Sequence, residues 1–498
     1  MSRAFSTFLV MAPCRRLQFN LSDMYPVPRL GIGYLSAHLK AHGHANVETR
    51  DIIAEREWVP DLVRRFTERG APDLLGISVT ILSLREAFEI ARGVKTRFPH
   101  TRVVVGGPGV NGFAASSLLR YGDAVDFFVR GEGEAALLGL VRALESGQPS
   151  FAAVPGLVWR DAAGDAVENP RGAYRDLDDG IRVDYAAQPM ARFRLHPPMG
   201  VYPYATMMET ARGCSFSCEF CCLSMPVRER SPAGVEAELR DLMRAYDLRE
   251  VHFIDPTFTL HRARSEELVE RVGRLGLRWS CKTRVDKVDE RLAARMAAAG
   301  CYLVAFGVES GEDDILGALG KNATGERAIE TFAACRRHRI RTTAYLLLAS
   351  PSETEAHVDR TISFVRRLAP DYVLYDLLQA DPANPLTRER IADGAFTADD
   401  LDRYYLSDDA TPLHHATVAG HAMSVARRRI ERASSDFYVR PRYFWERIRD
   451  LRTLQDALNL GAGGLTFFKD LLGLGRLWDH GTPSRGHREG THDTDHGT

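Results

Sequence analysis

Short apolar runs alternate with helical patterns through residues 1–150. Apolar runs of about four to eight residues are typical of buried strands, whereas apolar positions three and four residues apart indicate helices. The alternation predicts a doubly wound parallel sheet, a Rossmann-like (flavodoxin-like) fold that binds ligands at the carboxyl ends of its strands. We expect helices at Gly33–His42 and Leu84–Phe98, and strands at Phe8–Met11, Val47–Ile53, Leu74–Val79, Val103–Val105 and Phe127–Val129.

Turns of small and polar residues follow three of these strands. They are Ser78–Thr80, Gly106–Gly109 and Gly131–Glu134. Glycine in such turns lets a ligand approach the backbone closely. The chain has neither a Gly-x-Gly-x-x-Gly motif opening a helix nor a Walker A motif, which argues against a dinucleotide or a nucleoside triphosphate as the natural ligand.

Together with Pro72–Thr80, these turns resemble the cobalamin-binding domain of class B radical S-adenosylmethionine (SAM) enzymes. The Asp-x-His-x-x-Gly loop of cobalamin mutases is missing, so we expect no protein histidine on cobalt. Gly109 stands where the family often has histidine, and a side chain at Gly107 is expected to block the corinoid. A flavodoxin-like domain without a cofactor is the alternative. The resemblance implies that cobalamin is bound by Ser78, Thr80, Gly106, Gly107, Pro108, Gly131, Glu132 and Gly133.

Four of the eight cysteines lie between Cys214 and Cys222. Three of them, Cys214, Cys218 and Cys221, have the spacing Cys-x3-Cys-x2-Cys. Three thiolates at this spacing can hold a [4Fe–4S] cluster from one loop, and the missing fourth ligand leaves one iron open for a substrate or cofactor. Structural zinc is the alternative, although it normally has four ligands in two separated pairs.

This loop, with Phe220 directly before the third cysteine, is the signature of the radical SAM superfamily. The resemblance implies that Cys214, Cys218 and Cys221 bind the cluster and that the open iron binds the amino and carboxylate groups of SAM. It also implies that the Phe220 backbone contacts the adenine. We interpret Cys222 and the remaining cysteines as small apolar residues.

Strand and helix patterns continue to alternate after the cysteine loop, as a partial (β/α)6 barrel requires. Its six strands are expected at Ala205–Glu209, Glu250–Ile254, Arg278–Lys282, Tyr302–Gly307, Thr342–Leu348 and Tyr372–Leu378. Barrel enzymes place their chemistry at the carboxyl ends of strands, and the resemblance implies that SAM is bound there by Phe220, Asp255, Arg284, Glu309 and Ser310. Two family motifs are altered, at Ala349–Thr354 and Pro382–Pro385, and stay outside the expected site.

The fold class is therefore α/β: a Rossmann-like cobalamin-binding domain, then a partial (β/α)6 radical SAM barrel, then a helical C-terminal region. The C-terminal region either packs over the barrel or forms a lid over the substrate. We expect the cobalamin-binding domain at 1–150, a hairpin and linker at 151–199, the barrel at 200–395, the helical region at 396–478 and a disordered tail at 479–498.

Composition narrows the choice of partners. The 498 residues carry 65 Lys and Arg against 66 Asp and Glu, a net charge of −1, which leaves no basic excess for a nucleic-acid backbone. No apolar run approaches the ~20 residues that span a bilayer, and the N-terminus lacks the pattern of a signal peptide. We therefore expect a cytoplasmic protein with no membrane span and no nucleic-acid partner.

A cluster and a corinoid in one chain indicate one-electron chemistry combined with a methyl carrier. The resemblance implies a cobalamin-dependent radical SAM methyltransferase, in which a 5′-deoxyadenosyl radical takes hydrogen from an unactivated carbon of a small molecule. Methylcobalamin then supplies the methyl group, a second SAM remethylates cobalamin, and flavodoxin or ferredoxin supplies electrons. A cobalamin-dependent radical SAM oxidative cyclase has the same motifs. A non-catalytic electron-transfer or corinoid-carrier protein is the alternative of another class. The sequence identifies no catalytic acid or base.

Overall fold

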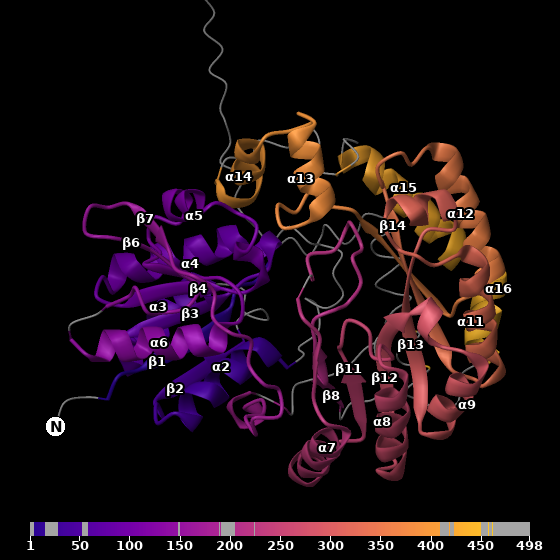
Figure 1. Cartoon of the computed structure of the whole chain (residues 1–498), viewed down its shortest axis with the longest axis horizontal. Coiled ribbons are helices and arrows are strands. Elements are labelled where there is room, and N and C mark those ends of the chain that lie inside the picture. Colours follow the sequence, from indigo (N-terminus) through magenta and orange to yellow (C-terminus); the bar gives the residue numbers. More distant parts are fainter. Residues whose placement is uncertain are drawn as a thin grey trace, which may run out of the picture. The chain divides into compact units, whose positions relative to one another are not determined.

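Two large sheets organise residues 1–440 (Figure 1). The computed structural model describes residues 4–14, 28–51, 58–147, 150–188, 190, 205–223, 225–408, 418, 423–449, 457 and 461. The described residues from Pro441 onward belong to a second unit, in which helix α16 spans Pro441–Arg449.

The first sheet has the strand order β2-β1-β3-β4-β5-β6-β7. Its first five strands are parallel to one another, and β6 pairs antiparallel with both β5 and β7. The hairpin that the sequence indicated after residue 150 therefore extends this sheet through β6. The strands are β1 (Thr7–Met11), β2 (Val47–Arg50), β3 (Leu74–Ser78), β4 (Arg102–Gly106), β5 (Phe127–Val129), β6 (Leu157–Arg160) and β7 (Ala166–Glu168).

Helices cover both faces of the first sheet because successive strand residues point to opposite faces. Leu9 belongs to the buried cluster with residues of α2 (Leu30–Ala41) and α6 (Gly133–Glu145). Phe8 and Val10 belong to the opposite cluster, which includes residues of α3 (Trp58–Arg69), α4 (Leu84–Arg97) and α5 (Ala115–Tyr121). This burial fixes the register of the sheet and so places its carboxyl-end turns side by side.

The second sheet is parallel throughout and has the order β8-β11-β12-β13-β14-β15. Within the described residues β8 and β15 lie at its two ends and do not pair, so the barrel is partial. Its strands are β8 (Ala205–Met208), β11 (Glu250–Phe253), β12 (Arg278–Arg284), β13 (Cys301–Glu309), β14 (Arg341–Leu348) and β15 (Tyr372–Leu377).

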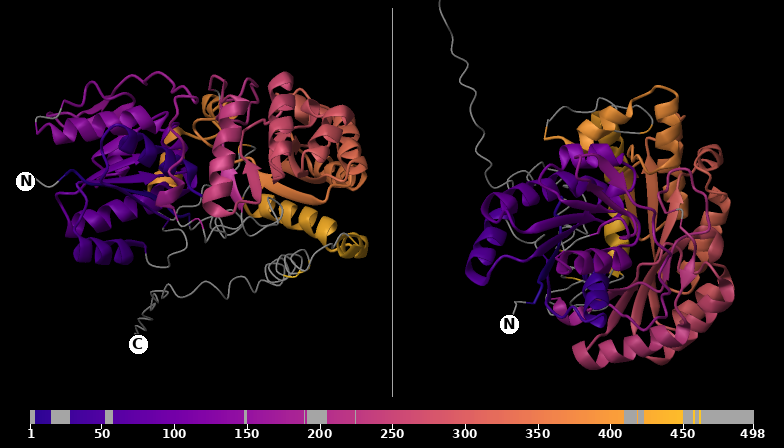
Figure 2. Two further views of the ribbon diagram at one scale, coloured as in Figure 1. Left: turned by 90° about the horizontal axis from the view of Figure 1, so that it is seen from below. Right: turned by 60° about the vertical axis from the view of Figure 1, so that its left-hand side comes forward.

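Helices follow the strands of the second sheet and cover its outer side (Figure 2). The Phe306 ring on β13 packs 5.1 Å from the Phe332 ring on one of these helices, measured between centroids. The helices are α7 (Pro232–Tyr246), α8 (Arg262–Arg274), α9 (Glu290–Ala298), α10 (Asp313–Ala318), α11 (Gly325–Arg337) and α12 (Glu355–Leu368).

The C-terminal helices of the first unit pack on elements from both sheets. Helix α14 (Ala398–Leu406) contributes Leu401 and Tyr405 to the core beside α4 and α5. Helix α15 (Met423–Tyr438) packs on α12 and β15, where the Tyr438 hydroxyl donates to the Val373 carbonyl oxygen at 2.7 Å. For the described part of this region, these contacts favour a packing role on the two sheets rather than the role of a lid over the substrate. The expected tail at 479–498 lies outside the described residues.

The predicted fold class is confirmed: a flavodoxin-like sheet precedes a partial six-stranded barrel and C-terminal helices. Among the described helices, none has both the length and the apolar character needed to cross a membrane.

Candidate functional site

The cysteine loop lies between two short antiparallel strands, β9 (Ala211–Arg212) and β10 (Arg228–Glu229). Gly213 starts the loop with φ +83°, and a Cβ there would lie 2.2 Å from the Pro226 carbonyl oxygen. The Cys214 amide donates to the Met225 carbonyl oxygen at 3.2 Å, and the Cys221 amide donates to that of Cys218 at 3.0 Å. The hairpin thus closes the loop tightly at its base.

Cys218 and Cys221 line a hollow of about 110 Å³. The three predicted ligand sulfurs are spaced too widely for one ion, because among the described residues only Glu312, Asp314 and His357 bring three such ligand atoms within 4.8 Å. Three thiolates on one zinc would be about 4 Å apart. The loop therefore fits a cluster better than a single zinc ion. Burial raises the pKa of the Cys218 and Cys221 thiols, so metal binding there releases protons.

The cysteine loop is also supported from outside. The Glu219 amide donates to the Leu319 carbonyl oxygen at 3.1 Å, and the Glu219 carbonyl oxygen accepts from the Leu386 amide at 3.1 Å. The Asn384 side chain donates to the Phe220 carbonyl oxygen at 3.1 Å while its own oxygen caps helix α13 (Pro385–Ala392). Our sequence analysis missed Asn384, although an Asn directly before Pro is a recognisable start of a helix.

Asp255 is fully buried at the end of β11. One of its carboxylate oxygens accepts from the amides of Thr210 and Ala211 at 2.6 and 3.1 Å, and the other accepts from the Thr210 hydroxyl. Burial raises the pKa of Asp255, while these hydrogen bonds act against that rise. The side chain thus fixes the entry to the cysteine loop, and its predicted contact with SAM is untested.

Two charged residues, Arg284 and Glu309, lie at the carboxyl ends of neighbouring strands, and Lys321 contacts both. Arg284 Nη1 lies 3.6 Å from Cys218 Sγ, and its guanidinium stacks 3.8 Å from the centre of the Phe216 ring. Glu309 accepts from buried Lys321 at 2.7 Å, and Arg284 donates to the Lys321 carbonyl oxygen. Lys321 did not emerge from the sequence because it follows a helix and no strand.

Ser310 is fully buried behind these residues. Its hydroxyl lies 3.3 Å from that of Thr361 and accepts from the Glu312 amide at 3.2 Å. The structure brings Arg284 and Glu309 close to the cysteine loop, whereas the Ser310 side chain supports the backbone of its own turn.

The turns at Ser78–Thr80 and Gly106–Gly109 pack backbone against backbone. A Cβ at Gly107, where φ is +109°, would lie 2.7 Å from the Val79 carbonyl oxygen, and one at Gly109 would lie 2.5 Å from that of Thr80. A side chain at Gly107 would thus collide with the protein's own turn, whether or not a corinoid lies beside it. The same close approach explains why histidine does not fit at position 109.

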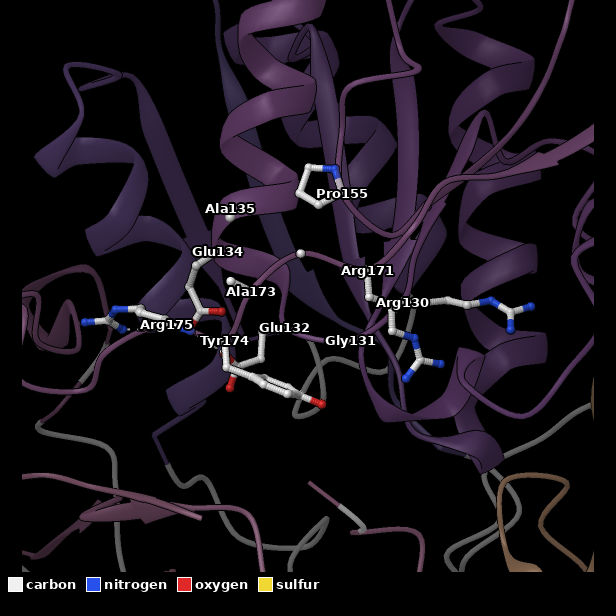
Figure 3. A pocket seen from close by; sticks show the side chains of 11 residues that line it. Arg130, Gly131, Glu132, Glu134, Ala135, Pro155, Arg171, Ala173, Tyr174 and Arg175 are labelled. Carbon is white, nitrogen blue, oxygen red and sulfur yellow. Dashed lines mark hydrogen bonds and ion pairs between the residues drawn. The ribbon is translucent and has the colours of Figure 1, made fainter. Parts of the chain in front are cut away.

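The turn at Gly131 borders a pocket of about 140 Å³ (Figure 3). Gly131 has φ +82°, and a Cβ there would meet only Arg171, at 3.7 Å. Its amide donates to the Asn111 side chain at 3.1 Å, which ties this turn to the one after β4. Pockets for whole ligands measure about 300–1,000 Å³, so this pocket is too small to hold a whole ligand of that size.

Glu132 joins the turn after β5 to the base of the cysteine hairpin. Its carboxylate accepts two hydrogen bonds from Arg228, at 2.5 and 2.9 Å, and one from Arg212 at 3.1 Å. Arg212 also donates to Glu134 at 2.8 Å and lies 4.8 Å from the centre of the Tyr34 ring. Burial acts to raise the pKa of Glu132, but the bonds from Arg228 and Arg212 outweigh it and lower that pKa.

A second contact between the two sheets lies at Gly112. A Cβ there would lie 2.4 Å from the Ala383 nitrogen, so the loop after β4 touches the turn that carries Asn384. The turns that we expect to hold cobalamin therefore connect to the cysteine loop by two routes, one ionic and one through close backbone packing.

Two family models match the chain: that of the radical SAM superfamily over residues 208–365 and that of the B12 binding domain over residues 21–141. The chain belongs to the B12-binding radical SAM enzymes. This confirms the predicted family, and the two domains imply the predicted cofactors: a [4Fe–4S] cluster, SAM and cobalamin. The individual SAM and cobalamin contacts stay predictions.

The chain is similar to proteins with more than one activity. It is 29% identical over 421 residues to an uncharacterized methyltransferase of Pyrococcus horikoshii, covering 83% of this chain and 88% of the relative. It is 27% identical to the anaerobic magnesium-protoporphyrin IX monomethyl ester cyclase of Rubrivivax gelatinosus, covering 73% of this chain and 66% of the cyclase. The structure of the radical SAM methyltransferase TsrM from Kitasatospora setae shares the fold, with a TM-score of 0.64 at 22% identity, over 79% of this chain and 76% of TsrM.

The first test concerns the cluster ligands. We expect Cys218→Ala to lower the iron content of the reconstituted protein from about four atoms per chain to near zero. Cys222→Ala is the matched control and should keep its iron, because Cys222 lies outside the spaced motif. Iron and sulfide analysis measures both, and equal iron in the two variants would contradict the assignment.

The second test concerns the backbone strain at Gly107. Gly107→Ala should lower the free energy of unfolding of the cofactor-free protein by about 1–3 kcal/mol, because of its positive φ and the Val79 contact. Gly106→Ala is the control, since its Cβ would make an ordinary 3.5 Å contact with Val129. Denaturant unfolding measures the difference, and equal stability of the two variants would refute the strain at Gly107.

The third test concerns the charge of Glu132. Glu132→Gln should lower the free energy of unfolding by about 1–3 kcal/mol at pH 7. Since the folded-state pKa lies below the ordinary 4.5, this contribution is complete above pH 4.5 and disappears as the pH falls through the folded value. Unfolding curves between pH 3 and pH 7 should therefore converge at the acid end. Glu270→Gln, which removes an exposed ion pair with Arg274, should change stability by less than about 0.5 kcal/mol.

Proposed function

We propose that the chain is a methyltransferase that replaces a hydrogen on an unactivated carbon of a small molecule with a methyl group. Similarity to the Pyrococcus horikoshii methyltransferase over most of both chains supports this outcome. The observation that carries the proposal is the joining of Glu132 to Arg212 and Arg228. It ties a turn of the B12-binding sheet to the hairpin of the cysteine loop, which suits two cofactors acting on one substrate.

When bound, the cluster and SAM supply a carbon-centred radical, and cobalamin supplies the methyl group. The chain's own residues hold and orient them: Cys214, Cys218 and Cys221 bind the cluster, and Arg284, Glu309 and the Phe220 backbone border SAM. Asp255 and Asn384 hold the two ends of the cysteine loop in place through the hydrogen bonds described above.

We propose that cobalamin lies over the carboxyl edge of the first sheet, bordered by the turns at Ser78–Thr80, Gly106–Pro108 and Gly131–Gly133. The pocket beside Gly131 supports this placement. We further propose that residues 1–150 with the β6–β7 hairpin act as the cobalamin-binding domain and 200–395 as the radical SAM barrel. Electrons come from flavodoxin or ferredoxin.

Ring formation is the second candidate outcome, because the chain is also similar to the Rubrivivax gelatinosus cyclase. The residues described above serve either outcome equally well, since both begin by removing a hydrogen atom. Product analysis is therefore the deciding measurement.

The fourth test distinguishes the two outcomes. The reconstituted protein is incubated anaerobically with cobalamin, reductant, trideuteromethyl SAM and small-molecule extract from its source cells. A methyltransferase should form 5′-deoxyadenosine and S-adenosylhomocysteine in about equal amounts, and a compound in the extract should gain one labelled methyl group. Mass spectrometry measures all three, and Cys218→Ala is the inactive control.

Substrate-dependent 5′-deoxyadenosine without S-adenosylhomocysteine or labelled product would overturn methyl transfer and favour the cyclase. Absence of 5′-deoxyadenosine, in protein with a full cluster, would contradict both outcomes.

A further inference from the structure

The inner face of the second sheet carries polar residues that no hydrogen bond to the cysteine loop explains. Successive strand residues alternate between faces, and Phe306 of β13 marks the outer, helix-covered face. On the inner face, the His252 ring of β11 bonds the Ser280 hydroxyl of β12 at 2.8 Å. Lys282, two residues after Ser280, shares that face. Barrel interiors are normally filled by branched apolar side chains, so this polar column is unusual.

Lys282 is half-buried inside the barrel, and its ammonium group has no partner among the described residues. Its side chain forms no hydrogen bond or ion pair with any residue that the structure describes, and burial lowers its pKa. Two acids at the carboxyl ends of neighbouring strands are already engaged, Glu309 with Lys321 and Asp255 with Thr210. A half-buried cation with no counter-charge among the described residues is available to bind a negatively charged ligand.

Lys282, Gly307 and Tyr345 are half-buried on this face, and the Glu309–Lys321 pair lies against Gly307, where a Cβ would be 2.5 Å from Glu309 Oε1. In register with Lys282 stands Ala305 on β13, and the next inner residue of that strand is Gly307. Beyond Gly307, in register with it on β14, lies Tyr345. The Tyr345 hydroxyl also has no described partner, and burial raises its pKa to about 12, so it stays a hydrogen-bond donor at neutral pH. Two donors thus flank two small residues.

The column also points toward the cysteine loop. Arg284 stands two residues after Lys282 on the same face, a rise of about 7 Å along the strand, and its guanidinium reaches Cys218 Sγ at 3.6 Å. On the other side, fully buried His252 has no partner for Nε2, and burial lowers its pKa to about 3. His252 is therefore neutral. Of the two basic side chains His252 and Lys282, only Lys282 can offer a positive charge to a ligand.

We propose that Lys282, assisted by the Tyr345 hydroxyl, binds a carboxylate or phosphate group of a ligand inside the barrel. That group belongs either to the substrate, which is then an acid held with its reacting carbon toward the cluster, or to SAM, through its carboxylate. The assignment of a substrate or SAM as the ligand rests on the proposed function. The binding site itself rests on the positions of Lys282 and Tyr345 on the inner face of the sheet.

The chain offers a sharp test because it has only six lysines. The protein with cluster and cobalamin is labelled with an amine-acylating reagent, and the labelling rate of each lysine is measured by peptide mass spectrometry. Separate samples contain SAM, decarboxylated SAM, or saturating SAM together with inorganic phosphate or acetate. The fifth test predicts that at least one oxyanion slows labelling of Lys282 fivefold or more, while exposed Lys40 changes little.

The arms distinguish the two sources of the charge. Protection by SAM but not by decarboxylated SAM assigns the SAM carboxylate, and Lys282→Met should then weaken SAM binding at least tenfold, with partial rescue in Lys282→Arg. Protection by phosphate or acetate in the presence of saturating SAM assigns an acidic substrate, and SAM affinity should be unchanged in Lys282→Met. Tyr345→Phe should reduce the protection in either case.

Labelling of Lys282 that no oxyanion slows, together with unchanged SAM affinity in Lys282→Met, would overturn the proposal. Circular dichroism and iron content of the variant show whether it is folded and loaded. The measurement involves no turnover, so it can fail while methyl transfer is confirmed, and it can succeed even if the product analysis favours a cyclase.

Discussion

The bidentate pairing of Glu132 with Arg228, shared with Arg212, is the constraint on which the site depends. A carboxylate in a glycine turn of one sheet holds both strands of the hairpin that presents the cysteines of the other. Such charge-assisted pairs have strict geometry, so they fix orientation as well as distance. The pairs are largely enclosed, with side-chain exposures of 12–17%, and salt screens enclosed pairs only weakly.

The two cofactor regions differ in how they achieve rigidity. The turns of the first sheet are rigid because glycines let backbones touch, as at Gly107 against Val79. The cysteine loop is rigid because three later segments form hydrogen bonds with its backbone. The Asp255 side chain binds its start, the Leu319 carbonyl oxygen its middle and the Asn384 side chain its end. A cluster held by only three thiolates gains from such support, since outer contacts orient the ligands.

Local patterns predicted the strands, the fold class and the cysteine motif, because each depends on spacing within a short stretch of chain. Glu132 shows where this reasoning stopped. Its place in a glycine turn suggested a cobalamin contact, but its partners lie 80 and 96 positions later. Lys321 and Asn384 were missed for the same reason: each acts through a distant neighbour. The close backbone contact at Gly107 likewise depends on Val79, which the sequence of the turn itself does not reveal.

The supports of the cysteine loop have a consequence for the order of synthesis. Domains form from the N-terminus as the chain emerges, so Glu132 is available when Arg212 and Arg228 appear. Leu319, Asn384 and Leu386 emerge roughly a hundred residues or more after Cys221. Until then the loop is held only by the contacts at its base. Completion of the barrel then closes the loop's outer side.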